Sequence, residues 1–253
     1  MSSDILVIPD VQTREGVCTK HILAAGKYAA WHKPDVIVFI GDFADTPSLS
    51  MYNSKKQAEG LTLESDSAAA IAALKLFLKP IKKAKGYNPR LVITTGNHEI
   101  SVRVKRLEEA QPELTGSIED KFTKYMVSQG IEIVPYLEVV KIEGISFSHI
   151  FSNPCSLKGA PIGGAVETMI KNLGHSFVCG HQQRLSVGKR YLSNGDVHIG
   201  VVAGAFYSHE EPYMNAQSQH HWRGIIYLGN ASNGNADIAE ISLDSLMKDY
   251  YES

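Results

Sequence analysis

The sequence predicts an α/β fold that contains two β-sheets. Short apolar runs rich in β-branched residues end at Pro or Gly, as expected of strands buried on both faces: ILVIP, VIVFIG, LVITTG and SFVCG. Helical patterns lie between these runs, and the alternation favours a largely parallel or mixed sheet covered by helices. Further along, short strand-like pieces joined by turn residues indicate a second sheet.

Two segments in the first half of the chain are predicted to be helices. They are TKHILAAGKYAAWHK (19–33) and SDSAAAIAALKLFLKPIKKAK (65–85), and both repeat apolar residues at intervals of three and four. Each begins with a residue suited to an N-cap, Thr19 in the first and Ser65 in the second. These helices are expected to cover the first sheet.

From Ile131 onward the pattern changes. IEIVPYLEVVKIEGISFSHIF reads as three short strands, and a second hairpin-like series runs over 186–243. Because no repeat, low-complexity tract or linker interrupts the chain, residues 1–253 are expected to form one domain. The polar stretches 53–65 and 207–221 are expected to be insertions that cover a site.

Composition excludes several classes of function. The net charge is −2 and the pI is near 6.5, so no global positive field draws the chain to nucleic acid or to an anionic membrane. The aromatic residues lack the spacing typical of RNA-binding folds, so sequence-specific nucleic-acid readout is not expected. Three widely spaced cysteines argue against a disulfide framework, and no apolar run reaches membrane-spanning length. The expected setting is the cytoplasm.

Polar side chains follow the predicted strands at the points where the strands end. Carboxylate, amide and imidazole groups that meet at one sheet edge form a mixed oxygen and nitrogen set, which suits Mn²⁺, Fe or Zn²⁺ better than Ca²⁺. There are more donors than one ion needs, so two ions are expected. The residues are Asp10 and Gln12 in PDVQ, Asp42 and Asp45 in GDFAD, Asn97 and His98 in GNHE, His149 in SFSHIF, and His181 and Gln183 in GHQQ.

The order of these motifs resembles that of the calcineurin-like metallophosphoesterases, in which D-x-(H), GD-x-x-D, GNHE, a lone His and GH-x-(H) follow one another. The whole chain, including PIGGAVE, GHSFVCGHQQ and HHWRGIIYL, is similar to the small metallophosphoesterases encoded by tailed bacteriophages. The resemblance implies a calcineurin-like α/β fold, a four-layer α/β/β/α sandwich of two mixed sheets flanked by helices. It also implies a dinuclear metal site where the strand ends meet and, for a phage protein, the host cytoplasm.

The resemblance implies a role for each motif residue. Asp42 is the carboxylate that bridges two divalent metal ions. His98 lies beside the substrate and pairs with Asp45, and the pair holds the phosphate and serves the leaving group. The remaining residues are implied to be metal ligands: Asp10, Gln12 and Gln183 for the first ion, and Asn97, His149 and His181 for the second.

Gln12 and Gln183 depart from the family pattern, which usually has histidine at both positions, and both changes fall on the first ion. An amide oxygen is a harder and weaker donor than imidazole, so this site should favour Mn²⁺ or Mg²⁺ and lose its ion more readily than the second. Mn²⁺ is therefore expected, with Mg²⁺, Fe or Zn²⁺ as alternatives at individual sites. Two further alternatives are water-bridged glutamines and a single-metal enzyme.

Other polar residues carry weaker signals. Glu99 is interpreted as structural, complementing the dipole of the helix that follows. Arg103 is a candidate substrate-binding residue and Arg106 a candidate contact to the same phosphate, with a solvated helix face as the alternative for both. His209 and His221 are candidate substrate-binding residues, with solvated loop histidines as the alternative. Histidines without a motif partner are expected on the surface or in the core: His21, His32, His175 and His198.

The predicted reaction is hydrolysis of a phosphate ester by a water molecule that two metal ions activate. A phosphodiester of a nucleotide or nucleic acid is favoured, because GDFADTPSLS resembles nucleases of this superfamily and the phage relatives point the same way. Residue 46 is also Thr, where protein phosphatases of the superfamily have the arginine that holds a dianionic monoester. The alternatives are a phosphomonoesterase and a non-catalytic, metal-stabilised binding module. The oligomeric state is left open.

Overall fold

The computed structural model describes residues 2–51, 59–210 and 221–251. Its first sheet has six strands in the order β11-β10-β1-β2-β3-β4. The strands β1 to β4 are parallel neighbours, and β10 and β11, from the end of the chain, pair antiparallel on the β1 side. The strands are β1 (Ser3–Ile8), β2 (Val36–Phe39), β3 (Arg90–Thr94), β4 (Glu132–Val134), β10 (Gly224–Ser232) and β11 (Asn235–Ser242).

The second sheet has five strands in the order β5-β6-β7-β9-β8. It is also mixed, because β6, β7 and β9 are parallel while β5 and β8 pair antiparallel at its two edges. The strands are β5 (Val140–Ile142), β6 (Ile145–Phe147), β7 (Phe177–Cys179), β8 (Leu185–Tyr191) and β9 (Val197–Ala203).

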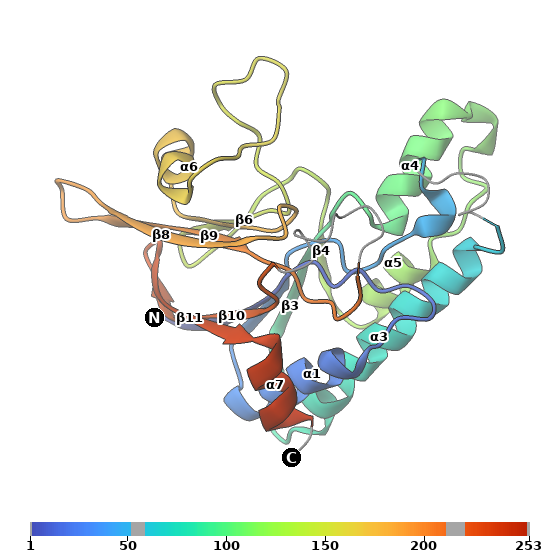
Figure 1. The fold of residues 1–253 in the computed structure, drawn as a ribbon, viewed down its shortest axis with the longest axis horizontal. Helices are drawn as coiled ribbons and strands as arrows, with labels where there is room; N and C mark the ends of the chain where they lie inside the picture. Colours follow the sequence, from blue (N-terminus) through green and yellow to red (C-terminus); the bar gives the residue numbers. More distant parts are fainter. Residues whose placement is uncertain (1, 52–58, 211–220, 252–253) are drawn as a thin grey trace.

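The two sheets face each other and carry helices on their outer faces, which confirms the predicted α/β/β/α sandwich (Figure 1). Side chains of β1 alternate between two cores, as the pleat of a strand requires: Ile5 and Val7 pack between the sheets, and Leu6 and Ile8 pack against the helices. A third core joins α6 to the outer face of the second sheet. Within the described residues the helices are α1 (Lys20–His32), α3 (Leu63–Lys83), α4 (Ile100–Ala110), α5 (Lys121–Ser128), α6 (Val166–Leu173) and α7 (Leu243–Tyr250), with 3₁₀ turns η1 (Pro47–Leu49) and η2 (Pro112–Leu114).

Both predicted helices form, but the second begins earlier than expected. Its N-cap is Thr62, whose hydroxyl oxygen accepts a hydrogen bond from the Ser65 backbone N–H at 3.1 Å. Ser65 therefore lies in the first turn of α3. The expected insertion at 53–65 consequently ends in this helix, and its residues 53–58 lie outside the described residues. The other expected insertion, 207–221, is described only over 207–210 and at His221.

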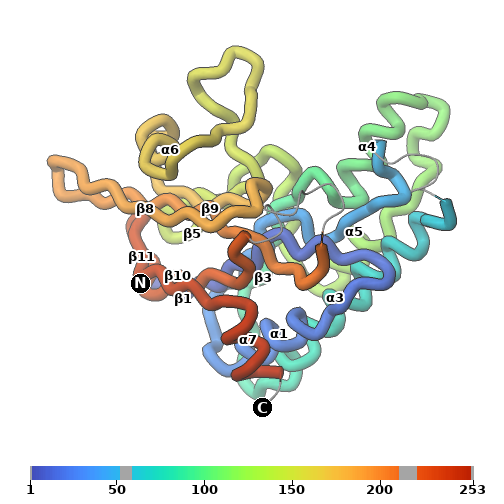
Figure 2. Tube along the Cα trace, in the orientation of Figure 1, coloured from blue at the N-terminus to red at the C-terminus, as the bar shows by residue number. Residues whose placement is uncertain are grey.

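Contrary to what the sequence had suggested, not all strands after Ile131 join the second sheet. β4 extends the first sheet, parallel to β3, and the hairpin β10–β11 returns to that sheet beside β1. Figure 2 shows the last strands of the chain lying next to the first. The sequence patterns identified these strands but carried no information on which sheet each would join.

The topology brings the motif residues to one region. β1, β2 and β3 are parallel neighbours, so the residues that follow them emerge at the same edge of the first sheet. β6 and β7 are parallel neighbours in the second sheet, and the Gly180 N–H donates to the His149 carbonyl at 3.2 Å. The site is therefore assembled between two sheets from five strand ends.

Among the described residues, none of the helices combines the length and apolar character needed to span a bilayer.

His21, on the inner face of α1, provides a test of this packing. Its side chain is buried with its ring 4.9 Å from that of Phe206. Burial lowers the pKa of His21 to about 4; the Phe206 backbone opposes this shift, and His209 and Arg223 add to it. Between pH 6.5 and 4 the unfolded chain therefore binds a proton at this position that the folded chain does not, so stability falls as the pH falls.

We expect His21→Phe to remove about 3 kcal/mol of this acid-induced loss in the free energy of unfolding. Urea unfolding of both proteins at pH 7 and pH 4 measures the difference, and His198→Phe is the control on a partly exposed strand position. Equal pH dependence in the wild type and His21→Phe would show that His21 is not held neutral in the fold.

Candidate metal centre

Residues predicted to hold the second ion meet at the ends of β2, β3, β6 and β7. Ligand atoms of Asp42, His149 and His181 all lie within 4.8 Å of one another. His149 Nε2 is 3.3 Å from Asp42 Oδ2 and 3.2 Å from Asn97 Oδ1. An imidazole pair, a carboxylate and an amide oxygen form a donor set that fits a divalent transition metal.

A backbone carbonyl fixes the orientation of His149. Its Nδ1 lies 2.8 Å from the carbonyl oxygen of Ile40, which can only accept a hydrogen bond, so Nδ1 carries the hydrogen and Nε2 points to Asp42 and Asn97. Burial alone would lower the pKa of His149, but Asp42 and other buried carboxylates raise it to about 10. The oxygens around Nε2 thus favour a positive charge there, and a bound cation would supply it.

Asp10 provides the strongest indication of a first ion. It is fully buried, and its Oδ1 accepts a hydrogen bond from the His181 N–H at 3.1 Å. Within the described part of the chain, its Oδ2 is buried without a hydrogen-bond partner. Burial raises the pKa of Asp10 to about 7; His149 opposes this shift and Asp42 adds to it. A buried carboxylate oxygen that lacks a donor is costly unless a cation neutralises it.

The two glutamines lie where first-ion ligands are expected. Gln12 is fully buried, and its N–H donates to the Asp42 carbonyl at 2.8 Å. Gln183 is 8% exposed, and its Oε1 accepts a hydrogen bond from the Tyr207 hydroxyl at 2.9 Å. An amide oxygen has two lone pairs, so this bond orients Gln183 and leaves it able to bind a metal. Direct ligation by the glutamines stays a prediction.

Four of the seven predicted ligands have an unusual backbone conformation. Their φ values lie in the left-handed region that residues with a Cβ rarely adopt. They are 46° for Gln12, 51° for Asp42, 65° for His181 and 54° for Gln183. Each such residue costs roughly 1–3 kcal/mol and persists only where the surroundings impose it. Four strained residues in three neighbouring strand-end loops are typical of a functional site.

Two motif glycines allow the loops to approach closely. A Cβ on Gly96 would lie 2.2 Å from Asp42 Oδ1, and one on Gly180 would lie 2.5 Å from Asp10 Oδ1. Only glycine fits against these carboxylates, one at each predicted ion site. The glycines of GNHE and GHQQ are therefore required by the packing of ligand side chains.

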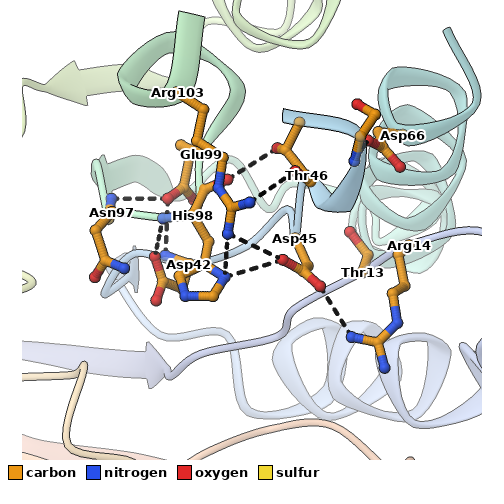
Figure 3. A network of polar contacts seen from close by, with 12 residues as sticks. Thr13, Arg14, Asp42, Asp45, Thr46, Asp66, Asn97, His98, Glu99 and Arg103 are labelled. Carbon is orange, nitrogen blue, oxygen red and sulfur yellow. Dashed lines mark hydrogen bonds and ion pairs between the residues drawn. The ribbon is translucent and has the colours of Figure 1, made fainter. Parts of the chain in front are cut away.

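Glu99 connects two of the motif loops. It is 2% exposed, and its carboxylate accepts backbone hydrogen bonds from Asp42, Phe43 and Gly96 at 3.0, 2.6 and 2.8 Å. The structural role expected for Glu99 agrees with these contacts, but the reason differs from a helix-dipole effect. Its carboxylate is turned away from α4 and holds the GDFAD loop against the GNHE loop (Figure 3).

His98 and Asp45 form the expected pair beside the metal cluster. His98 Nδ1 is 2.9 Å from Asp45 Oδ1, and the side chains are 22% and 11% exposed. Burial alone would lower the pKa of His98, but Asp42 and Asp45 raise it above its ordinary value. Burial would raise the pKa of Asp45, but His98 and two arginines lower it. Each member of the pair thus favours the charged form of the other, while Arg103 opposes a positive charge on His98.

Arginine side chains approach this pair from both sides (Figure 3). Arg103 Nη1 donates to the Thr46 carbonyl at 2.8 Å, and its Nη2 lies 2.9 Å from His98 Nδ1. With a side chain only 10% exposed, Arg103 is not on a solvated helix face. Arg14, which the sequence analysis did not single out, lies 2.9 Å from Asp45 Oδ2. The only feature of the sequence that suggested a role for Arg14 is its position two residues after Gln12. Its contact with Asp45 joins two different loops, so it could not be predicted from the sequence.

The other candidate substrate-binding residues lie around Tyr207. His209 stacks on the Tyr207 ring at 4.8 Å, and His221 meets it edge-on at 5.6 Å. Because Tyr207 bonds Gln183, both histidines lie near the predicted first-ion site, and their role toward substrate stays a prediction. Arg106, also on α4, is exposed and lies over the Tyr136 ring at 5.8 Å.

Comparisons with known proteins give little additional information. No protein-family model matches the chain. No curated protein matches it either. Among solved structures, it is similar to a dimetal phosphatase from Danio rerio, with 13% identity over 95% of this chain and 98% of that chain and a TM-score of 0.43. A likeness this weak supports no conclusion about fold or function, which rest on the geometry of this chain.

The paired glutamines generate a prediction about metal preference. We expect the double variant Gln12→His, Gln183→His to shift the first site from Mn²⁺ toward Zn²⁺, because imidazole nitrogen suits the softer ion. The second site should keep its preference, since its predicted ligands are unchanged. Mn²⁺ and Zn²⁺ stoichiometry and affinity, measured by calorimetry in both proteins, test this.

The larger rings could also disrupt packing, so circular dichroism and thermal unfolding of the double variant are the control. A well-folded double variant that keeps the wild-type metal preference at both sites would show that the glutamines are not ligands.

Proposed function

We propose that this chain is a calcineurin-like metallophosphoesterase that hydrolyses phosphate esters with two divalent metal ions. The observation that carries the proposal is that Asp42 contacts both halves of the site. Its Oδ2 faces His149 at 3.3 Å in the metal cluster, and its Oδ1 accepts the His98 N–H at 2.8 Å beside the His98–Asp45 pair. A metal cluster and an acid–base pair that share one carboxylate suit metal-assisted hydrolysis.

Each half of the site has a task in this proposal. One ion would be held by Asp10, Gln12, Asp42 and Gln183. The other ion would be held by Asp42, Asn97, His149 and His181. Bound divalent ions, with Mn²⁺ proposed, would lower the pKa of water and neutralise phosphoryl oxygens. With Nδ1 of His98 directed to Asp45, the Nε2 atom is the one available to protonate the leaving-group oxygen.

Two classes of phosphate ester, phosphodiesters and phosphomonoesters, are candidate substrates. The sequence favoured a phosphodiester of a nucleotide or nucleic acid, in part because residue 46 is not arginine. In space, however, Arg103 reaches this position from α4 and donates to the Thr46 carbonyl at 2.8 Å. This observation favours the second candidate, a phosphomonoesterase, because a guanidinium lies beside the His98–Asp45 pair after all.

Two substitutions separate the roles of metal ligand and proton donor. We expect Asp42→Asn to abolish activity and to reduce metal content at both sites, because the shared carboxylate supplies the charge that lets two dications approach.

We expect His98→Ala to lower kcat about 10²–10⁴-fold with full metal content, because it removes a transition-state contact and no ligand.

The assays use Mn²⁺-loaded protein with p-nitrophenyl phosphate and bis-p-nitrophenyl phosphate, and elemental analysis gives the metal content. His198→Ala, on β9, is the matched control and should behave like the wild type. Loss of metal in His98→Ala would make His98 a ligand. A wild type that binds Mn²⁺ but hydrolyses neither ester would favour the non-catalytic binding module.

A further inference from the structure

The short segment that follows β9 joins two loops that carry predicted ligands of the first ion. The Phe206 N–H donates to the Asp10 carbonyl at 3.0 Å, and the Gly204 N–H donates to the Arg184 carbonyl at 3.1 Å. Arg184 directly follows Gln183 in the sequence. The segment therefore contacts both the loop of Asp10 and the loop of Gln183.

Tyr207, the next residue of this segment, contacts Gln183 itself. It is fully buried, and its hydroxyl donates to Gln183 Oε1 at 2.9 Å. Neighbouring side chains hold its ring, because His209 stacks on it with ring centroids 4.8 Å apart and the Arg223 guanidinium lies 4.9 Å from its centroid. The hydroxyl thus has little freedom to move, and it fixes the amide oxygen that it contacts.

A glutamine ligand benefits from such a contact because its side chain is flexible. Gln is among the residues that lose most rotamer freedom when they are ordered. Its amide also has two different ends, and only the oxygen can bind a cation. The Tyr207 hydroxyl donates to that oxygen and leaves its second lone pair for a metal ion. The contact therefore orders Gln183 without blocking the atom that would bind the ion.

We propose that Tyr207 is a positioning residue that holds the Gln183 amide oxygen in place for direct binding of the first ion. The inference rests on the proposed metallophosphoesterase function. Ordering a free side chain at the moment of binding weakens the binding, and outer partners of metal ligands typically change metal affinity about tenfold or more. Tyr207 lowers this cost, because its hydrogen bond orders Gln183 before the ion binds.

The test compares Mn²⁺ binding by the wild type and by Tyr207→Phe, measured by calorimetry. The variant keeps the buried ring and loses only the hydroxyl. We expect the affinity of the first ion to fall about tenfold, while the second ion, with Asn97, His149 and His181 as predicted ligands, keeps its affinity. Wild-type affinity for both ions in Tyr207→Phe would overturn the inference.

Tyr87→Phe is the matched control. The Tyr87 hydroxyl donates to the Pro34 carbonyl at 2.9 Å, so this variant loses a hydrogen bond of the same kind. Tyr87 precedes β3 and Pro34 precedes β2, at the opposite ends of these strands from the motif residues. Tyr87→Phe should therefore bind Mn²⁺ like the wild type. Circular dichroism and thermal unfolding show that both variants are folded.

A double-mutant cycle separates positioning of the ligand from packing. Gln183→Ala should weaken the first ion, and adding Tyr207→Phe to it should cause no further loss, because the hydroxyl acts only through the amide. Equal losses from Tyr207→Phe in the two backgrounds, or wild-type affinity in Gln183→Ala, would overturn the inference and leave the phosphoesterase function standing. A wild type that binds no Mn²⁺ would instead overturn the proposed function and the inference with it.

Discussion

The arrangement of the site depends on Asp42. This residue is 1% exposed, has a φ of 51°, and is contacted by residues from several strand-end loops. Its carbonyl accepts the Gln12 N–H, its own N–H donates to Glu99, and its carboxylate faces both His98 and His149. Burial alone would raise the pKa of Asp42, but His149 and His98 hold it below its ordinary value. A single ionised carboxylate thus contacts loops that extend from both sheets.

This organisation concentrates negative charge in the interior. Asp10, Asp42 and Glu99 are all buried, and His149 is the fully buried cationic partner among them. Burial raises the pKa of Glu99, and the charge of Asp42 adds to this shift. Buried carboxylates at this density are unfavourable without compensating cations. The strained backbones, the close glycines and this charge imbalance all support the proposal that the loops bind divalent metal ions.

Much of this arrangement could be predicted from the sequence, because local patterns carry it. Apolar runs that end at Pro or Gly identified the strands, and the motif order identified Asp42, Asn97, His149 and His181 as neighbours. Strand partners were less predictable: β4 and the β10–β11 hairpin have ordinary strand patterns that do not encode which sheet they join. Sheet assignment depends on packing between distant segments.

Arg14 and Arg103 show the same limit within the site. Arg14 reaches Asp45 only because a backbone bridge brings Thr13 beside Ala44, and Arg103 does so because α4 directs it back toward Thr46. Neither contact follows from spacing in the sequence. The sequence shows that residue 46 is not arginine, but it does not show that Arg103 lies beside this position in the folded chain.

We propose that the buried carboxylates of this site hold two divalent ions that share Asp42. The most direct test is a crystal structure of the protein with Mn²⁺, with anomalous differences recorded above the manganese absorption edge. We expect two anomalous peaks, one beside Asp10 and one beside His149, with Asp42 between them. A single peak, or peaks away from Asp42, would contradict this proposal.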